Sequence, residues 1–146
     1  DESGLDGIPF GTDYEVAVNE LSARGLELKV AEWSEVDGLA IPAIEILDSS
    51  SRSNVVLTIL FTSRAEGGLG TVIIDGRVPT RLGLVVGEPF DLESARAELA
   101  GISAEPSAAT HWSAVTDAGS RITIVTTGGD QAHVDSIHLR YPSWGW

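Results

Sequence analysis

A nine-residue phrase that occurs twice constrains the fold of this chain more than any other feature. It reads Asp-Tyr-Glu-Val-Ala-Val-Asn-Glu-Leu at 13–21 and Asp-Leu-Glu-Ser-Ala-Arg-Ala-Glu-Leu at 91–99, with five of nine residues identical. Each copy follows an apolar-Gly step, at Gly11 and Gly87, and is followed by a Trp-Ser-x-Val segment. The second copy begins 78 positions after the first. Because solenoid repeats are shorter than this spacing, we expect two small units fused side by side.

The repeat divides the chain into three parts. Residues 1–6 are expected to form a polar tether, 7–82 a first α/β repeat and 83–146 a second one. The segment between the two repeats, residues 75–80, is too short to let two compact units move far apart. We therefore expect one pseudo-symmetric body with a continuous or nearly continuous sheet.

Each copy of the phrase has the pattern of an amphipathic helix of about three turns. Thr12 and Glu15 match a capping box, and Gly25 is placed to end the first helix. Asp91 or a neighbour is expected to cap the second helix and Gly101 to end it. The apolar stripes lie at helical spacing, at Tyr14, Ala17, Val18 and Leu21 in the first copy and at Leu92, Ala95 and Leu99 in the second.

After each helix the apolar pattern changes to the two-residue period of strands, with β-branched residues and polar turns between them. The expected strands lie near residues 39–47, 55–62 and 70–74 in the first unit and near 111–116, 121–127 and 134–141 in the second. Short turns make these strands antiparallel. The prediction is an α+β fold in which two tandem α-β-β-β repeats form an antiparallel sheet with the helices on one face.

A family resemblance follows from these motifs. An apolar-Gly step, a helix beginning Thr-x-x-Glu-Val with a Leu near its end, and a strand meander, all in two copies, resemble the β-lactamase inhibitory protein. The plan also looks like the single-copy lipoproteins of bacterial outer-membrane assembly. The resemblance implies helices behind a sheet whose concave open face and hairpin loops hold a target enzyme.

Two steps of the chain, Gly11-Thr12 and Gly87-Glu88, match the helix entry of that family. The family inhibitor has disulfides within its repeats, whereas this chain has no Cys. No target-contacting residue is carried over, because the inhibitor's loops do not align with particular residues here.

Composition limits the partners and the location that we expect. A net charge of −13 repels phosphate backbones and anionic lipids, so the expected partner is another protein, basic or neutral, and not a nucleic acid. No apolar stretch approaches the length of a transmembrane helix. The absence of Met predicts a mature exported protein, secreted or lipid-anchored at a bacterial cell surface, and Ala, Gly and Arg usage suggests a GC-rich genome.

No catalytic motif occurs in the chain, so a non-enzymatic role is expected. A nucleophile elbow, phosphate-binding loop, dinucleotide fingerprint and zincin motif are all missing. His133 and His138 would point to opposite faces of one strand and cannot share a metal there. Neither a cofactor nor a metal site is predicted, although an Asp-rich turn at 128–130 with Asp135 leaves calcium open.

The last strand and the C-terminal tail carry the candidate binding residues. If Ile137, Leu139 and Tyr141 alternate into the core, the intervening side chains lie on the opposite face. Trp33 and Trp112 are expected to pack between helix and sheet, whereas the aromatic tail either covers an apolar seam or serves as an anchor. The predicted partner-binding residues are Ser136, His138, Arg140, Tyr141, Trp144 and Trp146.

Two function hypotheses remain at this point. The first is an exported, non-catalytic protein-binding module that docks through the helix-free sheet face and loops, an inhibitor of an extracellular enzyme being one form of it. The alternative is a structural or accessory lipoprotein of the bacterial cell envelope. An enzyme ranks third, and a pocket with convergent carboxylates and a perturbed pKa would favour it. The sequence does not predict the oligomeric state.

Overall fold

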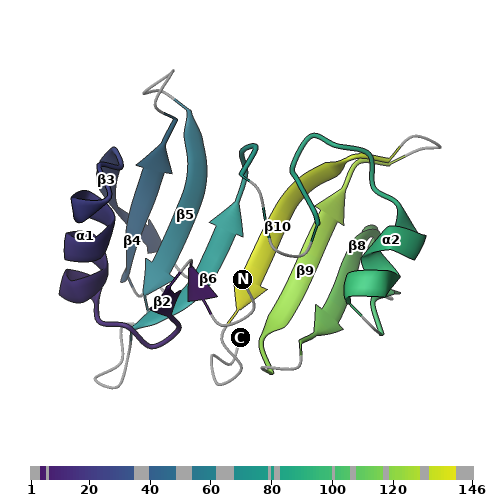
Figure 1. The fold of residues 1–146 in the computed structure, drawn as a ribbon, viewed down its shortest axis with the longest axis horizontal. Helices are drawn as coiled ribbons and strands as arrows, with labels where there is room; N and C mark the ends of the chain where they lie inside the picture. Colours follow the sequence, from purple (N-terminus) through teal and green to yellow (C-terminus); the bar gives the residue numbers. More distant parts are fainter. Residues whose placement is uncertain are drawn as a thin grey trace.

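The chain folds around one large antiparallel sheet, as the computed structural model shows (Figure 1). The structure describes residues 4–5, 7–34, 40–48, 54–61, 68–78, 80, 83–99, 101–105, 108–116, 119–128 and 132–140. Its elements are β1 (Gly4–Leu5), β2 (Ile8–Pro9), α1 (Tyr14–Ala23), β3 (Leu28–Ser34), β4 (Ala40–Leu47), β5 (Val55–Phe61), β6 (Leu69–Ile74), α2 (Leu92–Glu98), β7 (Ser103–Glu105), β8 (Ala108–Val115), β9 (Arg121–Thr126) and β10 (Val134–Arg140).

Eight strands form this sheet in the order β3-β4-β5-β6-β10-β9-β8-β7, and all neighbours are antiparallel. The two halves meet at β6 and β10, where Ile74 lies opposite Ile137 and Val72 opposite Leu139. The strands β1 and β2 form a separate two-stranded ribbon. An antiparallel α+β fold and a continuous sheet were both predicted, and both are observed.

Four strands follow each helix, so the predicted order α-β-β-β was wrong by one strand in each half. The missed strands are β3 and β7, which form the two edges of the sheet. An edge strand pairs on one side only and tolerates polar side chains, so its sequence carries a weaker apolar pattern than a central strand. β7 is also only three residues long.

Both helices start within one residue of the predicted position, but the N-cap of α1 differs from the expected one. At α1 the N-cap is Asp13, whose side chain makes no capping hydrogen bond, and the Thr12 hydroxyl donates to the Pro9 carbonyl at 2.7 Å. The predicted capping box at Thr12 is therefore wrong, because the helix begins one residue too late for it. At α2 the Asp91 carboxylate accepts the Glu93 amide, as expected, but the helix has seven residues, about two turns.

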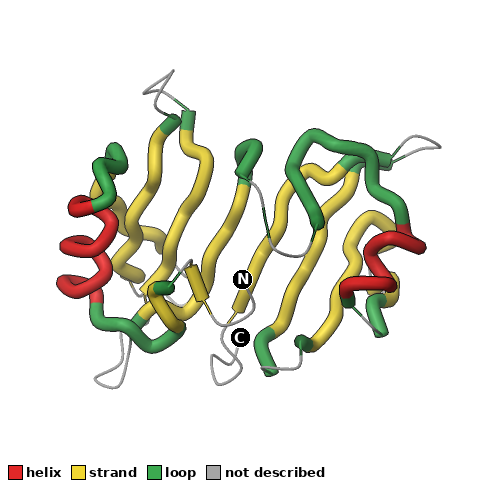
Figure 2. Tube along the Cα trace, in the orientation of Figure 1, coloured by secondary structure: helices red, strands yellow, loops and turns green. Residues whose placement is uncertain are grey.

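Both helices pack on the same face of the sheet, over its opposite ends (Figures 1 and 2). Ala17 and Leu21 of α1 and Ala95 of α2 belong to a single buried cluster. The same cluster contains inward residues of six strands, including Ile44, Ile59, Val72, Ala114, Ile124 and Ile137. Helices on one face were predicted, and one core joins the two halves.

The glycine steps before the helices make matching contacts in the two halves. The Gly11 amide donates to the Leu69 carbonyl and the Leu69 amide donates to Thr12, each at 2.8 Å. In the other half, the Gly87 amide donates to the Val134 carbonyl at 2.8 Å and the Val134 amide donates to Glu88 at 2.9 Å. Gly11 and Gly87 have φ of +86° and +89°, so a left-handed residue is needed at both steps. Each helix entry is thus tied to the first residue of the last strand of its half.

Candidate binding site on the helix-free face

The face of the sheet away from the helices differs between its two halves. On β4, β5 and β6 it carries a second buried apolar cluster, made of Ile41, Ala43, Leu60 and Ile73. The sequence predicts docking through the helix-free face as a whole, but over these strands that face is buried. The burial pattern gives the reason, because β6 and most of β5 are buried on both faces, with Thr58 and Thr71 as buried polar residues on the helix-free one.

The other half of this face is partly open to solvent. Alternation along β8, β9 and β10 places nine side chains on it, and we call them the β8–β10 patch: His111, Ser113, Val115, Arg121, Thr123, Val125, Ser136, His138 and Arg140. Val115 is 66% exposed, and Arg121 is also exposed. Their register is fixed by pairs such as His111 with Val125 and His138 with Thr123. A patch of mixed character with exposed side chains therefore lies on this half of the sheet.

The predicted residues on β10 lie together in this patch. Ile137 and Leu139 point into the core, as expected, and leave Ser136, His138 and Arg140 on the helix-free face. Ser136 Oγ and His138 Nε2 share a hydrogen bond of 3.2 Å. Ser136 is only 8% exposed, whereas His138 and Arg140 are half-buried. Tyr141, Trp144 and Trp146 lie outside the described residues.

Asp75 joins this group from the neighbouring strand. Because Ile74 pairs with Ile137, Asp75 follows β6 at the level of Ser136. Part of Asp75 is exposed, yet desolvation of its carboxyl group raises its pKa, with a smaller lowering by His138 and a raising by Asp135. Burial lowers the pKa of His138, Asp75 opposes this, and Arg140 and His111 lower it further. Asp75 and His138 therefore form an electrostatically coupled pair at the centre of the sheet.

The residue types of this group are those of a catalytic triad, in which a histidine lies between a serine and a carboxylate. The low exposure of Ser136 argues against a role as nucleophile, because little of that side chain can be reached from solvent. His138 is half-buried and Asp75 is exposed, so both side chains are at least partly accessible for a polar contact.

Sequence reasoning missed Asp75 and the contributions of β8 and β9. Asp75 ends an apolar run, Val-Ile-Ile-Asp-Gly, and a polar residue at a strand end was a signal that could have been followed. His111 and Arg121 could not be placed beside His138 from the sequence, because that required the pairing of β8, β9 and β10. Trp112 lies on the helix side, with its ring 5.4 Å from that of Phe90, just before α2. The prediction for the Trp33 side chain falls outside the described part.

Within the described part of the chain, no three His, Asp or Glu side chains are grouped so as to hold a metal ion. In the same part no helix is long and apolar enough to cross a membrane. Comparison of the chain with known protein families, curated proteins and solved structures finds no match. The resemblance to the β-lactamase inhibitory protein therefore remains a prediction.

Proposed function

We propose that this chain is a non-catalytic protein-binding module that docks through the β8–β10 patch. The observation that carries the proposal is the asymmetry of the sheet. Both helices and the larger core occupy one face, and the other face is buried on β4–β6 but exposes side chains on β8–β10. A face with an exposed valine, an exposed arginine and half-buried polar groups has the mixed composition of transient protein interfaces.

The partner class follows from this surface and the resemblance together. An enzyme held by such a face, as the inhibitor family implies, is one form of partner, and an assembly partner in the cell envelope is the alternative. An extracytoplasmic location stays part of this proposal. The net charge of −13 favours a partner that is basic or neutral as a whole.

We also propose that the two halves are copies of one unit related by a two-fold axis. The matched hydrogen bonds at Gly11 and Gly87 make Leu69 and Val134 equivalent positions. With that equivalence, Val72 corresponds to Ile137 and Ile74 to Leu139, and the observed pairs exchange these positions. The axis would then pass between Ile73 and His138, which lie opposite each other on the helix-free face.

The decisive experiment is capture of a partner followed by measured binding of the purified pair. The chain is used as bait against culture supernatant and envelope extract of the source organism, and the enriched protein is then purified. Calorimetry with Arg121→Glu and Val115→Asp is expected to show at least about tenfold weaker binding, because exposed interface residues are changed.

Two variants on the helix side serve as matched controls. Arg96→Glu changes an exposed arginine of α2, and Val16→Asp changes a valine of α1 that is 51% exposed. Both are expected to bind as the unmodified chain does. Equal loss in both pairs of variants, or loss in the helix-side pair alone, would show that the β8–β10 patch is not the docking surface.

A further inference from the structure

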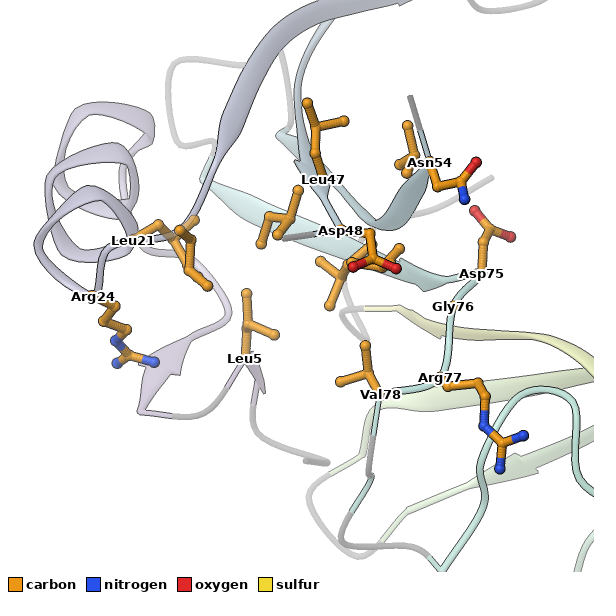
Figure 3. Close-up of a pocket in the computed structure, with 15 residues that line it drawn as sticks. Leu5, Leu21, Arg24, Leu47, Asp48, Asn54, Asp75, Gly76, Arg77 and Val78 are labelled. Carbon is orange, nitrogen blue, oxygen red and sulfur yellow. The ribbon is translucent and has the colours of Figure 1, made fainter. Parts of the chain in front are cut away.

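A cavity of about 840 Å³ opens at the end of the first half of the sheet, on the helix side. Its walls come from the end of β4, the start of β5, the segment after β6, the C-terminal end of α1 and β1 (Figure 3). The volume lies within the range of about 300 to 1,000 Å³ that is typical of small-molecule sites. None of the nine side chains of the β8–β10 patch lines this cavity, although Asp75, which lies near His138, does.

Most of the wall is apolar. Leu21, Ile46 and Leu57 line the cavity and also belong to the main core. Leu26 is 41% exposed and lines the cavity from the segment after α1. Such a surface gains free energy by burying a hydrocarbon group, at roughly 25 cal/mol per Å² of apolar area.

Polar groups gather at one end of the cavity. In the view of Figure 3, Asn54 and Asp75 both lie at this end of the lining, with the Asp48 carboxylate nearer the middle. Asp75 is exposed and makes no ion pair with any Lys or Arg of the described residues. An amide oxygen and a carboxylate are hydrogen-bond acceptors, and the carboxylate attracts a cation.

Neither of the two arginines that line the cavity forms an ion pair with Asp75. Arg77 Nη2 lies 3.2 Å from Glu88 Oε1, and Figure 3 shows its guanidinium directed away from Asn54 and Asp75. Arg24 and Asp48 each have a further interaction within the protein. The charge offered to a ligand is therefore that of Asp75, within a chain of net charge −13.

We infer that this cavity binds a small amphipathic amine, with its hydrocarbon part against Leu26 and Leu57 and its ammonium group at Asn54 and Asp75. An ammonium group supplies three donors and the positive charge that this end lacks. A charge-assisted hydrogen bond to Asp75 would distinguish an amine from an alcohol of the same length.

The test uses three probes with one hydrocarbon chain: octylammonium, octanol and octanoate. Each is titrated into the ¹⁵N-labelled full chain at about pH 8, where the amine is charged and His is neutral. Octylammonium is expected to shift the amides of Leu26, Gly76 and Val78 and to bind about tenfold more tightly than octanol. Octanoate is expected to bind most weakly.

Paired variants distinguish the contribution of the Asp75 charge to probe affinity from that of the apolar wall. Asp75→Asn is expected to reduce octylammonium affinity to that of octanol, whereas Asp13→Asn, which removes a carboxylate at the start of α1, leaves it unchanged. Leu26→Ser is expected to weaken all three probes, and Val16→Ser none. Equal or tighter binding of octanoate, no binding of any probe, or shifts confined to amides outside the cavity would overturn the inference.

Discussion

At the scale of single residues, burial and neighbouring charges both change the pKa of His138. Its imidazole is half-buried on the helix-free face and shares a hydrogen bond with Ser136. The charges of Asp75, His111 and Arg140 act on it. Burial is the largest cause of its lowered pKa, and His111 and Arg140 act in the same direction. The charged form of His138 is therefore disfavoured in the folded chain.

This predicts a loss of stability in mild acid. The folded pKa of His138 lies below the unfolded value of 6.5, so the unfolded state takes up the proton first. The contribution of His138 to the free energy of unfolding is therefore fully present above about pH 6.5 and decreases as the pH falls below that value. Urea unfolding at about pH 7.5 and about pH 6 is expected to show a smaller fall for His138→Gln than for the unmodified chain.

The measurements stay at about pH 6 and above because the Asp75 carboxyl group has the opposite effect on stability at lower pH. Its raised pKa favours proton uptake by the folded state, which stabilises the fold as the pH approaches the carboxyl range. His133→Gln removes a different imidazole and is the control. A pH dependence altered as much by His133→Gln as by His138→Gln would contradict the role given to His138.

At the scale of elements, the entry to each helix depends on close backbone contact with a strand. Gly68 lies directly beside Gly11, and a Cβ added there would be 2.3 Å from the Gly11 carbonyl oxygen. Real Cβ atoms do not approach backbone oxygens so closely, so a side chain at this position has to displace the step that leads into α1. The sequence showed the glycine at 68 only as part of a turn.

Gly68→Ala is expected to destabilise the chain by about 2 kcal/mol or more, because the clash involves backbone rather than a flexible side chain. Gly128→Ala is the matched change, since a Cβ there meets no atom within 4 Å. It is expected to lie within about 0.5 kcal/mol of the unmodified chain. Thermal and urea unfolding measure both. Similar losses in the two variants would show that the contact with Gly11 is not the cause.

At the scale of the whole molecule, the two halves share one sheet and one core. The buried cluster takes residues from both helices and from β4, β5, β6, β8, β9 and β10. The linker is short, and the central pairing of β6 with β10 is as regular as the pairings within each half. A chain built in this way has no boundary along which one half could unfold and leave the other intact.

We therefore predict a single cooperative unfolding transition. Leu21→Ala in the first half and Leu99→Ala in the second occupy matching positions of the repeated phrase, and each is expected to cost about 2–5 kcal/mol. Far-ultraviolet circular dichroism and tryptophan fluorescence are compared during urea unfolding, and each variant should lower the midpoint of both signals equally. Separate midpoints, with each variant moving only one of them, would indicate two independent units.

The local structure of this protein could be predicted from its sequence. The repeated phrase predicted both helices, and the positions of their apolar stripes agree with the buried Ala17, Leu21, Ala95 and Leu99. The strands β4, β5, β6, β9 and β10 were predicted within one or two residues, because central strands carry strong apolar periodicity. These features arise from neighbours along the chain, so sequence patterns report them.

Which surfaces meet could not be predicted from the sequence and follows from the folded structure. The edge strands β3 and β7, the burial of the face over β4–β6, and the position of Asp75 beside His138 all depend on pairing between distant segments. The cavity that Leu26 helps to line likewise combines five elements that no local sequence pattern connects. Strand pairing brings together residues far apart in sequence, and a side chain's exposure depends on everything packed against it, which the order of residues alone does not state.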